Sequence, residues 1–193
     1  SNAEKTGFFG FFDCFNHQLA VDKLFSEASD WLIQRGMTSV RGPFSLNINE
    51  QAGLLIKGFN SHARMMMGQG QPYYKDLIEK NGFRGIKDLF AYLTPMDTAY
   101  PKRNEKLLSR IRSNTDLTFR HLETKNYERD IAIEVKIFNE AWNDNWGFIK
   151  MSQDDVRHMA RQLQPLIIPE LISLAFYKGE PAAMAVALPD LNE

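Results

Sequence analysis

A short helix that ends at a glycine is the feature that most constrains the fold of this chain. It lies in residues 72–83, which read Pro-Tyr-Tyr-Lys-Asp-Leu-Ile-Glu-Lys-Asn-Gly-Phe. Tyr74, Leu77 and Ile78 stand at positions i, i+3 and i+4, so they predict one apolar face on a helix. Gly82 can adopt the left-handed conformation that ends a helix. This pattern predicts a helix packed on a core, followed by a sharp change of chain direction.

The residues on either side of this helix extend the prediction. Pro72 suits the first helical position, where its missing N–H costs nothing. After the glycine, Phe83 can fold back onto Ile78. The apolar side chains of residues 89–93 then alternate with aromatic ones, which predicts a strand that is at least partly covered on both faces.

The N-terminal part predicts a parallel strand–helix–strand unit. Residues 6–14 read TGFFGFFDC, which is typical of a buried strand, and Asn16 is a suitable N-cap for a helix. Apolar side chains at helical spacing over residues 21–32 predict an amphipathic helix that Gly36 closes. A second strand is expected at residues 37–41, and so short a connection between two strands favours a right-handed parallel crossover.

A boundary separates this part from the rest of the chain. Residues 94–104 contain two prolines, are mostly polar and show no periodicity, as is typical of a linker. A short basic helix is expected at residues 105–113, and a strand is expected at residues 117–122 because their side chains alternate.

The C-terminal part predicts two helices and a hairpin. The first helix has an apolar stripe, consisting of Ile131, Val135, Phe138 and Trp142. Ser152 and Asp155 form a capping-box signature that opens the second helix. Strands at residues 171–177 and 182–188 are joined by a turn and read as a hairpin.

Charge and composition exclude several classes of partner. The net charge of −1 gives no electrostatic footprint for nucleic acid or for an anionic membrane. No apolar run approaches the about 18 residues of a membrane span. Cys14 is the single cysteine, which fits a reducing compartment, so a cytoplasmic protein with no membrane partner is expected. Residues 1–3, Ser-Asn-Ala, are typical of a cloning remnant.

The order of elements resembles the GNAT superfamily of N-acetyltransferases, and tandem GNAT-like bacterial proteins in particular. Residues 4–94, with the Glu-Lys-Asn-Gly-Phe ending of the short helix, are similar to the back half of that fold. Residues 115–193, with the sequence EAWNDNWGF at residues 140–148, are similar to its front half, and residues 95–114 link the two. The resemblance implies an α+β fold with a mixed sheet. It also implies transfer of an acyl group from acetyl-CoA or acyl-CoA, as co-substrate, to a small-molecule amine.

The two halves stand in reverse order, so the resemblance implies a fragment of two domains. One expectation is a permuted fold in which the last strand, at residues 182–188, lies beside the first, at residues 6–14. Unpaired sheet edges favour aggregation, so a homodimer or a strand-exchanged completion of the sheet is the alternative expectation.

The resemblance also implies where a coenzyme would bind. In the family, backbone N–H groups at a glycine-rich strand–helix junction hold the pyrophosphate. The matching junction here, residues 13–18, has no glycine. Asn16, His17 and Gln18 are the candidate contacts to a bound anion, and surface capping of the helix is their other interpretation.

Candidate catalytic and acceptor-binding residues follow from the same resemblance. Ile78 stands where many members have a proton-donating tyrosine, and Tyr74, one turn earlier, is either a substitute donor or a core aromatic. Trp142, Trp146 and Phe148 are either walls of an acceptor pocket or, for Trp142 above all, core. The histidines share no ligand spacing, so no metal site is expected. Besides an incomplete acyltransferase, a non-catalytic GNAT-like module and an α+β domain unrelated to GNAT remain open.

Overall fold

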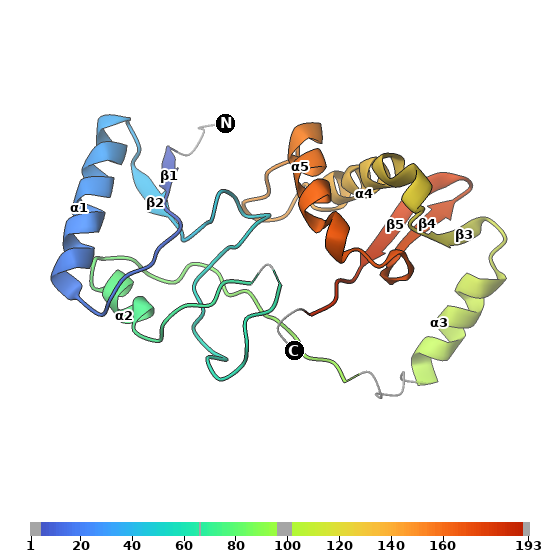
Figure 1. Ribbon diagram of the computed structural model, residues 1–193, viewed down its shortest axis with the longest axis horizontal. Helices are drawn as coiled ribbons and strands as arrows, with labels where there is room; N and C mark the ends of the chain where they lie inside the picture. Colours follow the sequence, from blue (N-terminus) through green and yellow to red (C-terminus); the bar gives the residue numbers. More distant parts are fainter. Residues whose placement is uncertain (1–4, 66, 96–101, 191–193) are drawn as a thin grey trace. The chain divides into compact units, whose positions relative to one another are not determined.

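The computed structural model describes residues 5–65, 67–95 and 102–190, and it has a mixed α+β fold with small sheets (Figure 1). The chain forms two compact units: residues 5–90 with Asp190 make up unit 1, and residues 91–189 make up unit 2. None of the described helices combines the length and the apolar character that crossing a membrane requires.

Unit 1 contains the predicted strand–helix–strand element. Strand β1 (Thr6–Phe8) pairs in parallel with β2 (Ser39–Arg41), and helix α1 (Gln18–Gln34) connects them (Figure 1). The parallel pairing is confirmed, but β1 is shorter than the predicted strand. The N-cap is His17 and not Asn16, because His17 Nδ1 accepts a hydrogen bond of 3.1 Å from the Ala20 N–H.

The core of unit 1 joins α1 to the short helix α2 (Tyr74–Glu79). Val21 and Phe25 of α1 are buried against Leu77 and Ile78 of α2. Partly buried side chains complete this core: Phe9, Phe12, Cys14, Leu54, Tyr73 and Phe83. The helix ends as predicted, since Gly82 has a φ of 86°. Pro72, however, precedes the helix and does not occupy its first turn.

The strand predicted at residues 89–93 is wrong. These residues form no strand, and Leu89 and Leu93 are 64% and 89% exposed. The alternation of apolar and aromatic side chains indicated a covered strand, but a strand also needs a neighbour for its backbone groups. The described strands β1 and β2 pair with each other only.

Unit 2 is a three-stranded antiparallel sheet with two helices, α4 (Tyr127–Ala141) and α5 (Gln153–Leu163). The sheet order is β3 (Leu117–His121), β4 (Ile172–Tyr177) and β5 (Glu180–Val186). Helix α3 (Lys102–Ser113) precedes the sheet. Single-turn 3₁₀ helices occupy Thr124–Asn126, Gln164–Leu166 and Pro169–Leu171. The predicted order of strand, two helices and hairpin is confirmed.

Each described strand pairs within its own unit. Strand β5 pairs with β4 through the hairpin turn, and β1 pairs with β2. The predicted pairing of residues 182–188 with residues 6–14 is therefore wrong, because β5 and β1 belong to separate sheets.

Candidate functional site

Helix α4 buries two acidic side chains. Asp130 is 0% and Glu134 is 9% exposed, and together with Ile137 they form the buried face of the helix. The predicted apolar stripe lies beside this face, where Ile131, Val135 and Phe138 are half-buried and Trp142 is 49% exposed. The apolar stripe therefore predicted the wrong buried face of α4. Acidic residues are rarely buried unless they are paired, so the helix pattern alone did not indicate the face that carries Asp130 and Glu134.

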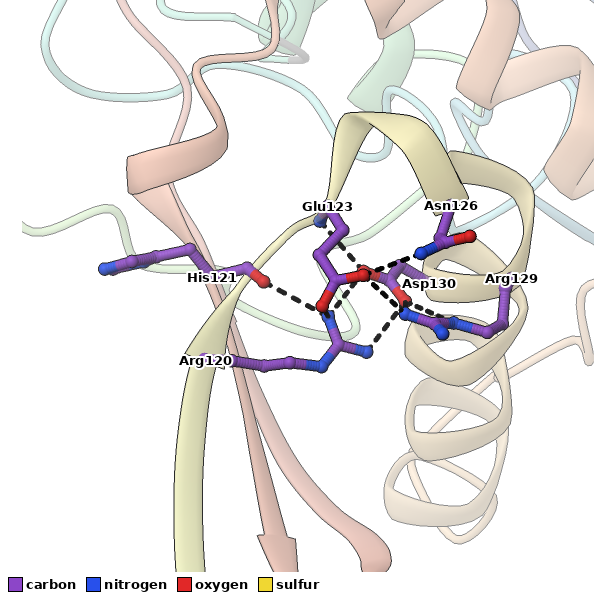
Figure 2. Close-up of polar contacts among 6 residues, drawn as sticks. All are labelled: Arg120, His121, Glu123, Asn126, Arg129 and Asp130. Carbon is purple, nitrogen blue, oxygen red and sulfur yellow. Dashed lines mark hydrogen bonds and ion pairs between the residues drawn. The ribbon is translucent and has the colours of Figure 1, made fainter.

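Arg120 on β3 is the partner that makes the burial of Asp130 favourable. Its Nη1 and Nη2 donate hydrogen bonds of 2.5 and 2.7 Å to Asp130 Oδ2 and Oδ1 (Figure 2). The backbone N–H of Glu123 donates to Oδ2 at 2.9 Å, and Arg129 Nε donates to Oδ1 at 3.1 Å. Every lone-pair direction of a buried carboxylate is costly to leave empty, and four donors surround this one.

A second acid completes the network at the surface. Glu123 Oε2 accepts hydrogen bonds from Asn126 Nδ2 at 2.7 Å and from Arg129 Nη2 at 3.0 Å (Figure 2). Arg120 Nη1 also donates to the His121 carbonyl at 3.1 Å. Arg120 is therefore held by Asp130, by the His121 carbonyl and by an ion pair with Glu123 Oε1 at 3.9 Å, which fixes the end of β3 against the start of α4.

The two buried acids of α4 have opposite pKa shifts. Burial acts to raise the pKa of Asp130, but the hydrogen bonds from Arg120, the Glu123 N–H and Arg129 outweigh it and lower the pKa to about 2. For Glu134, burial and then the nearby charge of Asp130 raise the pKa to about 7. Among the described residues, no donor lies within hydrogen-bond distance of Glu134 Oε1. Such a carboxyl can take up or release a proton near neutral pH.

A groove of about 580 Å³ lies between α4 and α5. At one end the Tyr127 hydroxyl donates a hydrogen bond of 2.8 Å to the Ala160 carbonyl. At the other end Asn139 accepts from the Met151 N–H at 2.9 Å and donates to the Met151 carbonyl at 3.1 Å. Because the start of α4 contacts the end of α5, the two helices run antiparallel along the groove.

The predicted acceptor-binding residues are brought together only in part. Trp142 stacks on Phe138 with ring centroids 5.2 Å apart, and Phe148 contacts the same ring at 5.5 Å. Trp146 lies in the same loop and is 36% exposed. Trp142 is thus half-exposed and does not belong to the core of unit 2. A role for these residues in binding an acceptor stays a prediction.

Two of the three candidate coenzyme contacts have partners within unit 1. His17 caps α1, as described above, and Gln18 Nε2 donates to Asp22 Oδ1 at 2.7 Å and to the Leu77 carbonyl at 3.2 Å. Asn16 is exposed. Helix capping therefore accounts for His17, and anion binding by these residues stays a prediction.

Tyr74 is a core aromatic whose hydroxyl is engaged. The side chain is 5% exposed, its hydroxyl donates to Asp13, and it accepts a hydrogen bond of 3.3 Å from the Cys14 N–H. Burial and then the hydrogen bond to Asp13 raise the pKa of Tyr74. These contacts favour the core interpretation, and proton donation by Tyr74 stays a prediction. Among the described residues, no group of three or more histidine, cysteine or acidic side chains is placed to hold a metal ion.

Sequence reasoning missed the site on α4. A usable signal was present: Asp130 and Glu134 are four positions apart, and Ile137 follows on the same helical face. Arg120 at the end of β3 and Leu122 just after it are two positions apart, so they point to the same face of an extended chain, and Leu122 is buried. An arginine on the inward face of a strand, near two acids on one helical face, indicates a buried ion pair.

Comparison with known proteins links the chain to two bacterial relatives. It is 34% identical over 189 residues to "Protein YghO" of Escherichia coli, and the match covers 97% of this chain and 48% of that protein. It is 33% identical over 187 residues to "Bacterial ceramide synthase" of Caulobacter vibrioides, with the same two shares of 97% and 48%. The chain thus spans about half the length of the curated relatives it matches. No family model matches the chain, and no solved structure matches it significantly.

Proposed function

We propose that this chain is part of an N-acyltransferase that joins a fatty acyl group to the amine of a long-chain base. The similarity to a protein named bacterial ceramide synthase supports this proposal, because it extends over 97% of the chain. A ceramide is an amide of a fatty acid and a long-chain amino alcohol. The synthesis of such a product forms a bond between an acyl carbon and an amine nitrogen.

The proposed donor is an acyl-CoA thioester, and the proposed fold is of the GNAT type. The order of strand, two helices and hairpin in unit 2 supports the fold, as does the parallel strand–helix–strand element of unit 1. In the reaction the amine nitrogen attacks the thioester carbon, the carbon–sulfur bond breaks, and the thiolate leaves. The amine must lose a proton as the amide forms, so the reaction needs a proton acceptor.

Whereas the similarity over 97% of the chain is the observation that carries the proposed function, Glu134 is the residue that we propose as this proton acceptor. Its carboxyl is buried, one oxygen lacks a donor among the described residues, and its pKa is about 7. A general base works best when its pKa lies near the pH of the reaction, and it can act directly or through one water. Asp130, with a pKa of about 2 and four donors, is held as a permanent carboxylate and positions Arg120.

The test is an acylation assay with the full-length protein. Palmitoyl-CoA and a long-chain amino alcohol are incubated with it, and the amide is measured by mass spectrometry. Glu134→Gln should lower kcat by a factor of about 100 or more. Glu140→Gln, the same substitution at an exposed position of the same helix, should leave kcat unchanged. The absence of amide from every long-chain base would refute the function. An active Glu134→Gln variant would refute the role of Glu134 alone.

A second candidate function, a non-catalytic binding module, is favoured by one feature of unit 1. The hydroxyl of Tyr74 is engaged by Asp13 and Cys14, and Ile78 cannot donate a proton. Calorimetry with acetyl-CoA on the full-length protein separates the candidates. Saturable binding without amide formation supports the module, whereas turnover supports the enzyme.

A further inference from the structure

The groove between α4 and α5 has an apolar floor. Ile131 and Val135 contribute to it from α4, and Val156 and Ala160 contribute from α5. The volume of about 580 Å³ falls within the range of about 300–1,000 Å³ that is typical of small-molecule pockets.

The groove is also long. Tyr127 and Asn139 line its two ends, and the stretch of α4 between them rises about 18 Å along the helix axis. The hydrogen bonds at both ends hold the two helices together, so the opening follows the helix pair and is not a flat surface. A linear aliphatic chain fits this form better than a compact ring system does.

The rim of the groove is basic. Lys136, Arg157 and Arg161 line it, and Glu128 is the acid among the lining residues. Arg157 donates a hydrogen bond of 3.1 Å to Asp154. Lys136 and Arg161 are exposed and have no ion-pair partner among the described residues. A cation near each end of an apolar floor favours an anionic head group and disfavours a cationic one.

We propose that the groove between α4 and α5 binds one long-chain amphiphile with an anionic head group, of which a fatty acid is the simplest. The aliphatic chain lies along the apolar floor, and the head group lies at one end of the groove, against Arg161 beside Tyr127 or against Lys136 beside Asn139. This site goes beyond the proposed acyl transfer, because it requires neither Glu134 nor an amine acceptor. A single free chain is the proposed occupant, because the groove follows one pair of helices that hydrogen bonds join at both ends.

The first test blocks the groove. Palmitate displaces a fluorescent fatty-acid probe from the full-length protein, at concentrations below those at which palmitate forms micelles. Ala132→Trp places a large ring in the groove from an exposed lining position, so palmitate should bind at least about tenfold more weakly. Glu140→Trp places the same ring on α4 outside the groove and should leave the affinity unchanged.

The second test reverses the charge of the rim at two exposed positions. Lys136→Glu combined with Arg161→Glu should weaken palmitate binding about tenfold and strengthen the binding of a long-chain alkylammonium ion. Lys125→Glu combined with Lys150→Glu changes the net charge equally outside the groove and should change neither affinity. Unchanged palmitate affinity in both groove variants would overturn the proposal. Binding to vesicles of anionic phospholipid without binding to palmitate would overturn it as well.

The outcomes are independent of the acylation assay. If amide forms and both groove variants bind palmitate with unchanged affinity, the groove proposal fails and the proposed function stands. If the groove variants weaken palmitate binding while no amide forms, the groove proposal stands and the proposed function fails.

Discussion

Arg120 on β3 and Asp130 on α4 form a two-pronged ion pair, with hydrogen bonds of 2.5 and 2.7 Å, and Asp130 is completely buried. One helical turn further on, Glu134 is buried with one oxygen that lacks a donor among the described residues. The two carboxyls therefore differ in pKa, about 2 against about 7. Two neighbouring acids with such different pKa values are typical of sites in which one carboxyl is ionised while the other can hold a proton.

The ion pair should make a large contribution to the stability of unit 2. Asp130→Ala removes the acceptor and leaves the Arg120 guanidinium, whose side chain is 27% exposed, without its main partner. Breaking a buried pair from one side costs about 3–5 kcal/mol. We expect the free energy of unfolding, measured by urea denaturation, to fall by about 3 kcal/mol.

The matched control is Asp154→Ala. Asp154 also accepts from an arginine, Arg157 at 3.1 Å, but its side chain is 91% exposed. Exposed ion pairs contribute at most about 1 kcal/mol, so this loss should be small. Equal losses in the two variants would contradict the importance of burial for the Arg120–Asp130 pair.

Glu134 should make stability fall as the pH rises. Its pKa in the folded protein is about 7, above the ordinary value of 4.5, so the protonated form is favoured by folding. The stabilisation is fully present below pH 4.5 and is lost as the pH rises through 7. The difference in pKa corresponds to about 3 kcal/mol. Unfolding curves measured at about pH 5–8 should show this decrease in the free energy of unfolding. Glu134→Gln should remove most of the decrease.

Asp130 should act in a different pH window and with the opposite sign. Its pKa in the folded protein is about 2, below the ordinary value of 3.8, so the charged form is favoured by folding. Its stabilisation is present above pH 3.8 and is lost as the pH falls through 2. Acid denaturation of Asp130→Ala should therefore be flatter in this window than that of the unsubstituted protein. An identical acid profile for both would show that Asp130 is not responsible.

Tyr74→Phe distinguishes a structural tyrosine from a proton donor. The substitution removes the hydroxyl that contacts Asp13 and Cys14, and we expect unfolding to cost about 1 kcal/mol less. Because burial and the bond to Asp13 raise the pKa of Tyr74, we expect kcat for acylation to change less than about threefold. A drop of about 100-fold would instead identify Tyr74 as a general acid.

Gly82→Ala tests the glycine that ends α2. Gly82 has a φ of 86° and open space where a Cβ would stand. The cost therefore comes from the left-handed backbone alone, at about 1–2 kcal/mol. Gly85→Ala, at a position that also has open space but no positive φ, should change the free energy of unfolding by less than about 0.5 kcal/mol. Equal effects would show that the conformation of Gly82 is not what constrains it.

Local signals explain the elements that were predicted correctly. The spacing of apolar residues over residues 21–32 and the left-handed glycines Gly36 and Gly82 act within a few residues, and α1 and α2 end where they indicate. The capping box of Ser152 and Asp155 is present, with both of its hydrogen bonds. Each of these signals acts on the local backbone conformation, which residues close in the sequence determine.

The errors arose where the outcome depends on a partner distant in the sequence. Residues 89–93 have the composition of a strand but lack a neighbouring strand to pair with. The buried face of α4 was placed on its apolar stripe, because the stabilising partner of Asp130 lies on a different element and the pattern of one helix does not show it.

The sequence by itself determined the helices, the glycine stops of α1 and α2, the parallel unit and the order of strand, two helices and hairpin, because turn conformation and side-chain spacing are local properties. Only the tertiary structure decided that Asp130 and Glu134 face inward and that a groove with a basic rim opens between α4 and α5. A carboxylate becomes stable in an interior only when donors from another element reach it. That condition is met here by Arg120 on a neighbouring strand.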